Sequence, residues 1–169
     1  MNPNDAEKFT EWLNDLELIV NLQLFDSVIN VEHERAFLSN SSNLSNSHDY
    51  SIIDIEKDEI IGNCGFLDID NLNQTAEVGI FIGNKNYWDK GYGTEALNLL
   101  LDYGFNALNL YNVMLKVYSC NKRAIRSYEK VGFKQVGIRR KALHRNREKY
   151  DILFMDLLVD EFYEKNNAK

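Results

Sequence analysis

Residues 77–96 read EVGIFIGNKNYWDKGYGTEA, in which a strand leads through a glycine-bearing turn into a helix. β-Branched residues at positions 78, 80 and 82 follow the two-residue period of a buried strand. From Tyr92 onward, apolar residues recur at helical spacing as far as Phe105. Gly91 and Gly93 permit close backbone approach at the turn, and the first N–H groups of a helix have no partner inside it. The stretch therefore predicts a backbone cradle for an anion such as phosphate.

A glycine pair alone does not decide between this anion site and a plain strand-to-helix turn. The turn is not a Walker A loop, because no Gly-Lys-Ser/Thr follows it at the required spacing. The third glycine of a dinucleotide-binding motif would fall at Ala96, which that motif tolerates. The preceding segment, however, is not the first strand of an obvious βαβαβ array.

A second group of informative segments follows the helix that begins at Tyr92. Tyr111–Val117 reads as a strand, and Asn121 can cap a helix whose apolar stripe ends at Gly132. Phe133 then begins another extended run.

With these segments in this order, the chain resembles the GCN5-related N-acetyltransferase (GNAT) family. Within that family it is similar to the RimJ/RimL-like branch, which also includes spermidine N-acetyltransferases. The matching segments are DKGYGTEA at 89–96, LDYGFNALNLYNVML at 101–115, NKRAIRSYEKVGF at 121–133 and YDILFMDLLVDEF at 150–162. The match covers most of the chain from about Asp49 onward. One departure is Trp88, which stands at the first position of the pattern Gln/Arg-x-x-Gly-x-Gly/Ala, as in many members of this branch.

The resemblance implies an α/β (α+β) architecture, the GNAT fold. Its central sheet is mixed, mostly antiparallel with a parallel splayed pair at the coenzyme site, and is flanked by helices. We expect a single domain over residues 1–169, because a chain of this length with 44% hydrophobic residues supports one sizeable core and is short for two. The first helix is predicted from about Asn4 to Asp15, with Asn4 and Glu7 as a capping box. The family strand that normally precedes this helix is expected to be absent.

The remaining elements follow from periodicity and turn residues. A helix is predicted at Val31–Leu38, followed by a Ser/Asn-rich stretch at 39–48 that we expect to be mobile. Strands at Tyr50–Glu56 and Ile60–Asp68 form a hairpin that continues into the strand at Glu77. A closing hairpin pairs Gln135–Leu143 with Lys149–Leu157 around a turn at 145–147.

Composition excludes several classes of protein. A formal net charge of −7 argues against broad binding of nucleic acid or anionic membranes. It suits a cationic substrate, but acidity also serves solubility alone. No apolar run reaches membrane-spanning length and the start lacks a signal peptide, so a cytoplasmic location is expected. Cys64 and Cys120 form no Cys-x-x-Cys pair, and the three histidines are scattered, so we expect reduced thiols and no metal site.

The resemblance implies a reaction in which acetyl-coenzyme A is co-substrate and a primary amine attacks its thioester directly. In this family the strand that matches Ile80–Ile82 pairs with the pantetheine arm, and the turn that matches Asp89–Thr94 binds the pyrophosphate. Lys130 belongs to a basic helix that can meet the adenosine phosphate or be a solvated face. The coenzyme-binding residues implied in this way are Ile80, Phe81, Ile82, Asp89, Lys90, Gly91, Tyr92, Gly93, Thr94, Asn121 and Lys130.

Two residues are candidates for proton transfer. Tyr128 matches the tyrosine that commonly protonates the leaving thiolate in this family, although helix spacing alone favours a packing role. Glu77 is the candidate base, acting through water, because an alkylamine is almost wholly ammonium at neutral pH. The alternative for Glu77 is a strand-end carboxylate that faces solvent or pairs with Lys or Arg. Asn121 matches a coenzyme contact, and helix capping explains it equally well.

The acceptor is the least determined feature, since the branch acts on ribosomal-protein N-termini, polyamines and other small amines. We expect a small-molecule amine, such as a polyamine, or a protein N-terminus as the partner, without nucleic acid or membrane. The sequence leaves the oligomeric state open, with a homodimer as one option. The carboxylates that can meet a cation, or simply be exposed charge, are Asp26, Glu32, Glu34 and Asp49. Tyr87 and Trp88 are expected to pack beneath the turn, and the alternative for them is to line the acceptor groove. The alternative to an enzyme is a catalytically inactive coenzyme A-binding sensor or scaffold.

Overall fold

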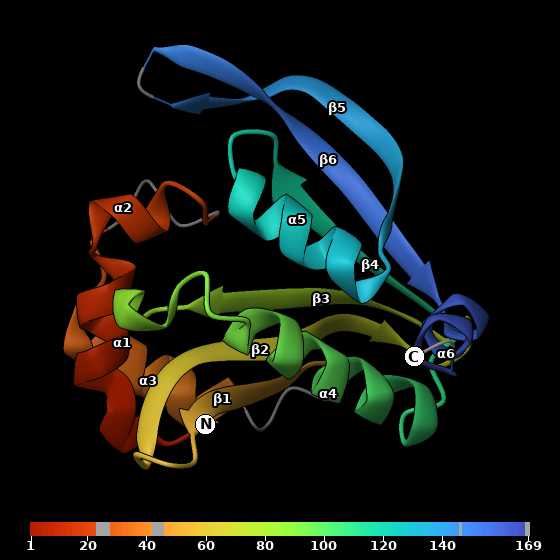
Figure 1. The fold of residues 1–169 in the computed structure, drawn as a ribbon. Coiled ribbons are helices and arrows are strands. Elements are labelled where there is room, and N and C mark those ends of the chain that lie inside the picture. The colour runs from red at the N-terminus through yellow and green to blue at the C-terminus, as the bar shows by residue number, and fades with distance from the viewer. Residues whose placement is uncertain (23–27, 42–45, 146, 168–169) are drawn as a thin grey trace.

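The computed structural model describes residues 1–22, 28–41, 46–145 and 147–167, and its framework is a six-stranded sheet (Figure 1). The strand order is β1-β2-β3-β4-β6-β5. The strands are β1 (His48–Asp54), β2 (Glu59–Asp70), β3 (Thr75–Ile82), β4 (Asn112–Tyr118), β5 (Lys134–Arg145) and β6 (Glu148–Leu158). Neighbouring strands are antiparallel except β3 and β4, which confirms the mixed sheet with one parallel pair.

Short and long helices surround the sheet. They are η1 (Pro3–Asp5), α1 (Ala6–Leu13), α2 (Leu16–Ile19), α3 (Val31–Ser41), η2 (Lys85–Tyr87), α4 (Tyr92–Asn106), α5 (Lys122–Val131) and α6 (Val159–Asn167). Figure 1 shows α1, α2 and α3 together at one end of the sheet, with α4 and α5 on either side of the line along which β3 and β4 separate.

The parallel pair β3–β4 is short. Its register runs from Thr75↔Asn112 to Glu77↔Met114, and no pairing between the two strands follows. Each strand nevertheless continues, because β2 pairs with β3 as far as Ile82 and β6 pairs with β4 as far as Tyr118. The sheet therefore divides into two wings that separate beyond Glu77.

The main core lies between the sheet and α4. Leu97 and Leu101 of α4 and Phe66 and Val78 of the sheet are at most 5% exposed. A Cβ atom at Gly104 would lie 2.4 Å from Phe66 Cζ, so only glycine permits this close approach of helix to sheet. This packing fixes where α4 begins, which is at the separation of the two wings.

A second core covers the other face of the sheet. Along β3, side chains alternate between faces, so Phe81 points away from the face that carries Val78. Its ring makes edge-to-face contacts with Phe9 and Trp12 of α1, with centroid distances of 6.0 Å and 6.3 Å. The two cores thus place helices on both faces of β3.

The N-terminal helix prediction is wrong in its details. The residues predicted as one helix, Asn4 to Asp15, fall in η1 and α1, and the helix ends at Leu13; α2 was not predicted. Residues 1–5 form no strand. The Asn2 side chain, rather than Asn4, accepts the capping hydrogen bond, because Pro3 suits the first position of the turn. Asn14 ends α1, and its side chain exchanges two hydrogen bonds with the backbone of Ile29.

The other predicted elements are confirmed with shifts of one to three residues at their ends. α3 continues to Ser41, into the stretch that was predicted to be a mobile loop. Residues 42–45 of that stretch, and Asn146 of the predicted turn between β5 and β6, lie outside the described residues. α6 was not predicted, because it follows β6 without an intervening turn residue.

Replacing Gly104 tests the close packing of α4 on β2. We expect Gly104→Val to lower the free energy of unfolding by about 1–3 kcal/mol, since the added methyl groups collide with Phe66. The measurement is urea denaturation followed by circular dichroism. Gly137→Val in β5 is the control, because a Cβ there meets Phe154 at an ordinary 3.8 Å. Equal stability of both variants and the parent would contradict the packing account.

Candidate functional site

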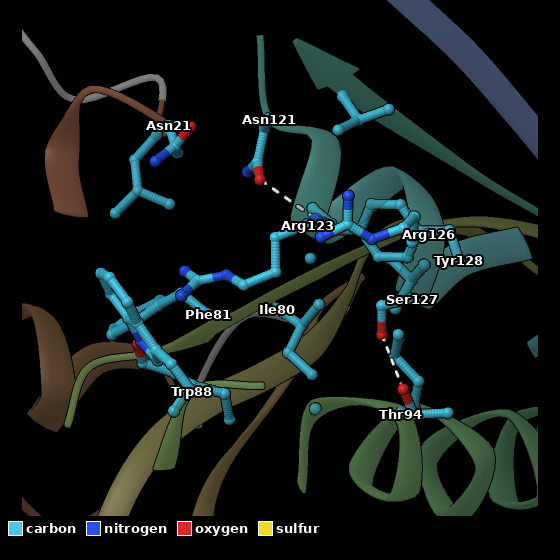
Figure 2. Close-up of a pocket in the computed structure, with 18 of the residues that line it drawn as sticks. Asn21, Ile80, Phe81, Trp88, Thr94, Asn121, Arg123, Arg126, Ser127 and Tyr128 are labelled. Atoms are coloured by element: carbon cyan, nitrogen blue, oxygen red, sulfur yellow. Dashed lines mark hydrogen bonds between the residues drawn. The ribbon is translucent and has the colours of Figure 1, made fainter. Parts of the chain in front are cut away.

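A cavity of ≈ 470 Å³ opens where β3 and β4 separate. Its walls are the second half of β3, the end of β4, the turn before α4, and α5 (Figure 2). Leu18, Asn21 and Leu22 of the N-terminal region close one side. The volume lies within the range of cavities that hold cofactors and small molecules.

The turn before α4 is open toward this cavity. Gly91 is the N-cap of α4 with a left-handed φ of 93°, and no side chain caps the helix. The first backbone hydrogen bond of the helix runs from Glu95 N–H to Gly91 C=O, so the amides of residues 92–94 have no partner inside the helix. A Cβ at Gly91 would meet nothing within 4 Å, and one at Gly93 would meet only Ile82 Cγ1 at 3.6 Å. Space, free amides and the helix dipole together fit a phosphate group.

Most of the predicted site residues line the same cavity. Of the thirteen, Lys90 and Tyr92 do not: Lys90 is exposed, and the Tyr92 ring contacts the Tyr87 ring at a centroid distance of 4.9 Å. Those that line the cavity are Glu77, Ile80, Phe81, Ile82, Asp89, Gly91, Gly93, Thr94, Asn121, Tyr128 and Lys130.

Polar contacts beneath the turn hold it in place. The buried Tyr87 hydroxyl donates a hydrogen bond to Asp54 Oδ2 at 2.8 Å and accepts one from Lys57 Nζ at 3.2 Å. The Trp88 indole N–H donates to Ile82 C=O at 2.7 Å. Tyr87 and Trp88 therefore support the turn as predicted, and both also line the cavity. The Ile82 carbonyl on β3 already accepts a hydrogen bond.

Tyr128 lies in the cavity wall on α5. Its side chain is 9% exposed, and its ring packs edge-to-face on Phe133 at a centroid distance of 6.0 Å. Burial raises the pKa of the Tyr128 phenol to about 12. Within the described part of the chain its hydroxyl has no hydrogen-bond partner. The phenol is thus a protonated donor at neutral pH, available to a group in the cavity.

Glu77 lies where the two strands part. Its Oε2 atom is 2.6 Å from Lys116 Nζ of β4, and both residues line the cavity. The carboxylate therefore pairs with a lysine, which was the structural alternative to its role as base. The role of Glu77 as a general base that acts through water stays a prediction.

The two helices that flank the cavity are joined directly. Thr94 Oγ1 of α4 and Ser127 Oγ of α5 lie 2.8 Å apart, within hydrogen-bond distance (Figure 2). At the start of α5, the Asn121 side chain accepts a hydrogen bond from Ala124 N–H at 3.1 Å. The capping role of Asn121 is confirmed, and its side chain also borders the cavity.

Two arginines of α5 that were not among the predicted site residues also line the cavity. Arg123 and Arg126 line the cavity together with Lys130, whereas Lys122 does not. A usable signal was present, because residues three and four positions apart share one face of a helix. The cavity therefore has a cationic wall opposite the cradle.

Arg123 reaches across the mouth of the cavity. Its guanidinium carbon lies 3.6 Å from the centroid of the Trp88 ring, a cation–π contact that Figure 2 shows. Burial lowers the pKa of Arg123, and the negative charges of Asp89 and Glu17 oppose this shift. The side chain is thus a partly desolvated cation near the turn.

The four carboxylates considered for an acceptor differ in their surroundings. Asp26 lies outside the described residues, and Glu32 is exposed. Glu34 is buried at 5% exposure, and this burial raises its pKa, but it lines neither the cavity between β3 and β4 nor the smaller cavity at Asp49. Asp49 lines a second, smaller cavity of ≈ 190 Å³.

Two other expectations concern metals and membranes. No group of three or more His, Cys, Asp or Glu residues placed to hold a metal ion occurs in the described ranges. Across those same ranges, every helix is too short or too polar to cross a bilayer. Cys64 and Cys120 are free thiols.

Comparison with known sequences gives one clear family. The family model described as an acetyltransferase (GNAT) domain matches residues 1–134. The chain is 32% identical over 164 residues to an uncharacterized N-acetyltransferase, p20, of Bacillus licheniformis. That match covers 96% of this chain and 92% of the relative. It is 33% identical over 137 residues to spermidine N(1)-acetyltransferase of Escherichia coli K12, covering 79% of this chain and 64% of that protein.

Solved structures share the fold. A spermidine N-acetyltransferase from Vibrio cholerae, solved in complex with CoA and spermine, superposes with a TM-score of 0.84. The two chains are 21% identical, and the superposition covers 96% of this chain and 95% of that one. At this identity the likeness concerns the fold alone.

The raised pKa of Tyr128 should make the free energy of unfolding fall at alkaline pH. Below the ordinary tyrosine pKa of about 10 the Tyr128 phenol is neutral in both the folded and the unfolded chain. Its contribution to the free energy of unfolding is then fully present. As the pH rises toward the folded value of about 12, only the unfolded chain ionises, and the contribution is lost. We expect the parent to lose about 1–1.5 kcal/mol more than Tyr128→Phe between about pH 9 and pH 11. Denaturant titrations at both pH values measure this, and parallel losses would contradict the burial of the phenol.

Proposed function

The chain belongs to the acetyltransferase (GNAT) family, and on that premise we propose that it transfers the acetyl group of acetyl-coenzyme A to a primary amine. One observation carries the proposal: a single cavity combines an open amide turn with a buried, protonated phenol. The names of its relatives, which include a spermidine N(1)-acetyltransferase, support the same activity.

The coenzyme would lie along the free edge of β3 with its diphosphate on the amides of residues 92–94. The cationic wall made by Arg123, Arg126 and Lys130 supports this orientation, because it faces the cradle with charges opposite to those of phosphate. Asn121 would border the coenzyme arm while capping α5. In this assignment Arg123 leaves its contact with Trp88 when the coenzyme enters.

The chemistry requires two proton movements. The coenzyme supplies an acetyl thioester; the amine nitrogen forms a bond to the acetyl carbon, and the carbon–sulfur bond breaks. Because the amine is almost wholly ammonium at neutral pH, its nitrogen loses two protons in all, one before the attack and one as the amide forms. The sulfur gains one proton, and the other is released to solvent. Tyr128 would donate the proton to sulfur, and its pKa of about 12 suits it to remain a donor at neutral pH. Glu77 would accept the proton of the amine through water, with Lys116 holding its carboxylate at the cavity wall.

A small-molecule amine is the acceptor that we favour over a protein N-terminus. The support comes from the relatives, since one is named for spermidine and a structural neighbour was solved with spermine. A homodimer and a cytoplasmic location also stay predictions, as does the assignment of residues 1–169 to one domain. The alternative of an inactive coenzyme-binding domain predicts no release of free thiol from acetyl-coenzyme A with any amine.

Replacing Tyr128 tests its role as general acid. We expect Tyr128→Phe to lower kcat at least about tenfold while the Kd for coenzyme A changes little, because only proton donation is lost. Thiol release from acetyl-coenzyme A measures turnover, and calorimetry measures Kd. Tyr111→Phe, at a half-exposed tyrosine outside the cavity, is the matched control. A variant that turns over as fast as the parent would remove Tyr128 from the mechanism.

Filling the cradle tests coenzyme binding separately. Gly93→Val should weaken the Kd for coenzyme A at least about tenfold, because the added methyl groups occupy the space in front of the amides. Gly137→Val, at a residue that does not line the cavity, should leave Kd unchanged. Retained affinity in Gly93→Val would mean that the diphosphate binds elsewhere.

A further inference from the structure

The smaller cavity lies on the face of the sheet opposite α4, and it meets the coenzyme cavity at β3. Both cavities are lined by Gly79, Ile80 and Phe81 of β3, together with Leu22 and Leu67. Asp49 of β1 and Gly65 of β2 line only the smaller one. A molecule in the smaller cavity would therefore reach the coenzyme cavity over the middle of β3.

The floor of the smaller cavity is a row of three residues across the sheet. Asp49 pairs with Gly65, and Gly65 pairs with Gly79, so all three share one face. Two of the three positions carry no side chain, which leaves a groove running from β1 to β3 (the groove of Asp49, Gly65 and Gly79). Figure 1 shows the three strands side by side.

The Asp49 side chain lies over Gly65 in this groove. A Cβ at position 65 would come within 2.7 Å of Asp49 Oδ1 and 2.4 Å of the His48 carbonyl oxygen. Glycine at this position therefore allows the carboxylate to extend along the groove toward β3.

The Asp49 carboxylate has no hydrogen bond and no ion pair within the described part of the chain. Burial raises the pKa of the Asp49 carboxyl, and the Met1 amino group and His48 oppose this with smaller effects. Partly buried carboxylates are normally paired or hydrogen-bonded, because burial removes the solvation of their charge. The side chain thus provides a negative site in a cavity, ready for a cation.

The distance between Asp49 and β3 sets the length of a ligand that could place a cation at Asp49 and reach the coenzyme cavity. Adjacent strands lie about 4.8 Å apart, so the carboxylate over Gly65 and the junction at β3 are separated by roughly one to two strand spacings, about 5–10 Å. A single amine cannot occupy both places. A short aliphatic chain with a nitrogen at each end spans them.

Resting on the proposed function, we propose that Asp49 binds the second ammonium group of a diamine acceptor. The reacting nitrogen then lies over Gly79, next to the thioester. Asp49 is accordingly a specificity-determining residue, and it takes no part in the bond changes. The groove selects acceptors with two positive nitrogens over monoamines of equal length.

Paired acceptors and a matched variant test this. The parent protein is assayed for thiol release with putrescine, a four-carbon diamine, and with n-butylamine. We expect at least about tenfold higher kcat/KM for the diamine, arising mainly from KM, since loss of one charge-assisted contact has about this effect. Asp49→Asn should remove most of this preference while kcat/KM for n-butylamine changes little. Asp68→Asn, at an exposed aspartate of the same sheet, should behave like the parent.

A binding measurement complements the kinetics. Calorimetry of putrescine with protein saturated by coenzyme A should detect binding to the parent and to Asp68→Asn, and at least tenfold weaker binding to Asp49→Asn. Thermal unfolding of Asp49→Asn confirms that the variant is folded, and Asp49→Ser provides a second replacement. Equal effects of Asp49→Asn on both amines, or no diamine preference in the parent, would overturn the role of Asp49 and leave acetyl transfer intact. Absence of thiol release with any amine would overturn the proposed function and this role with it.

Discussion

Strands β3 and β4 form parallel backbone pairing over three residue pairs only, and each functional feature lies where this pairing stops. Neither strand ends there, because each is held along its other edge by an antiparallel neighbour. The consequence is a wedge-shaped opening in a continuous sheet, in which the facing edges of β3 and β4 have no partner strand. Such an edge is normally a liability, and a ligand that occupies it removes the exposed backbone groups from solvent.

The elements around the opening are held by contacts that the ligand does not need to supply. α4 sits close to β2 because Gly104 admits the Phe66 ring, which sets the position of the turn at Gly91. Tyr87 anchors that turn from below through Asp54 and Lys57. The Thr94–Ser127 contact ties α4 to α5. A site built in this way is largely preformed, so little of the binding energy is spent on ordering the protein.

The sequence predicted the scaffold better than the surroundings of the site. Strands, the glycine turn and the Asn121 cap follow local rules of periodicity and capping, and the structure agrees with them. The end of α1 at Leu13 is accompanied by tertiary hydrogen bonds between the Asn14 side chain and the Ile29 backbone, which no local pattern reports. The Glu77–Lys116 pair and the place of Arg123 over Trp88 likewise require knowing how β3, β4 and α5 meet.

The groove of Asp49, Gly65 and Gly79 illustrates the same limit. In the sequence these residues belong to three separate strands, and only the register brings them into one row. Asp49 had been one of four candidate carboxylates, and burial in a cavity now separates it from Glu32 and Glu34. Charge and register together make the proposed acceptor groove chemically distinct from the proposed coenzyme cavity.

The central claim is that the opening between β3 and β4 orients a thioester against Tyr128. A crystal structure of the complex with coenzyme A tests it most directly. We expect the diphosphate on the amides of residues 92–94, the pantetheine arm along β3, and the sulfur within hydrogen-bond reach of the Tyr128 hydroxyl. A coenzyme bound outside the opening, or a sulfur on the far side of the cavity from the phenol, would contradict the account.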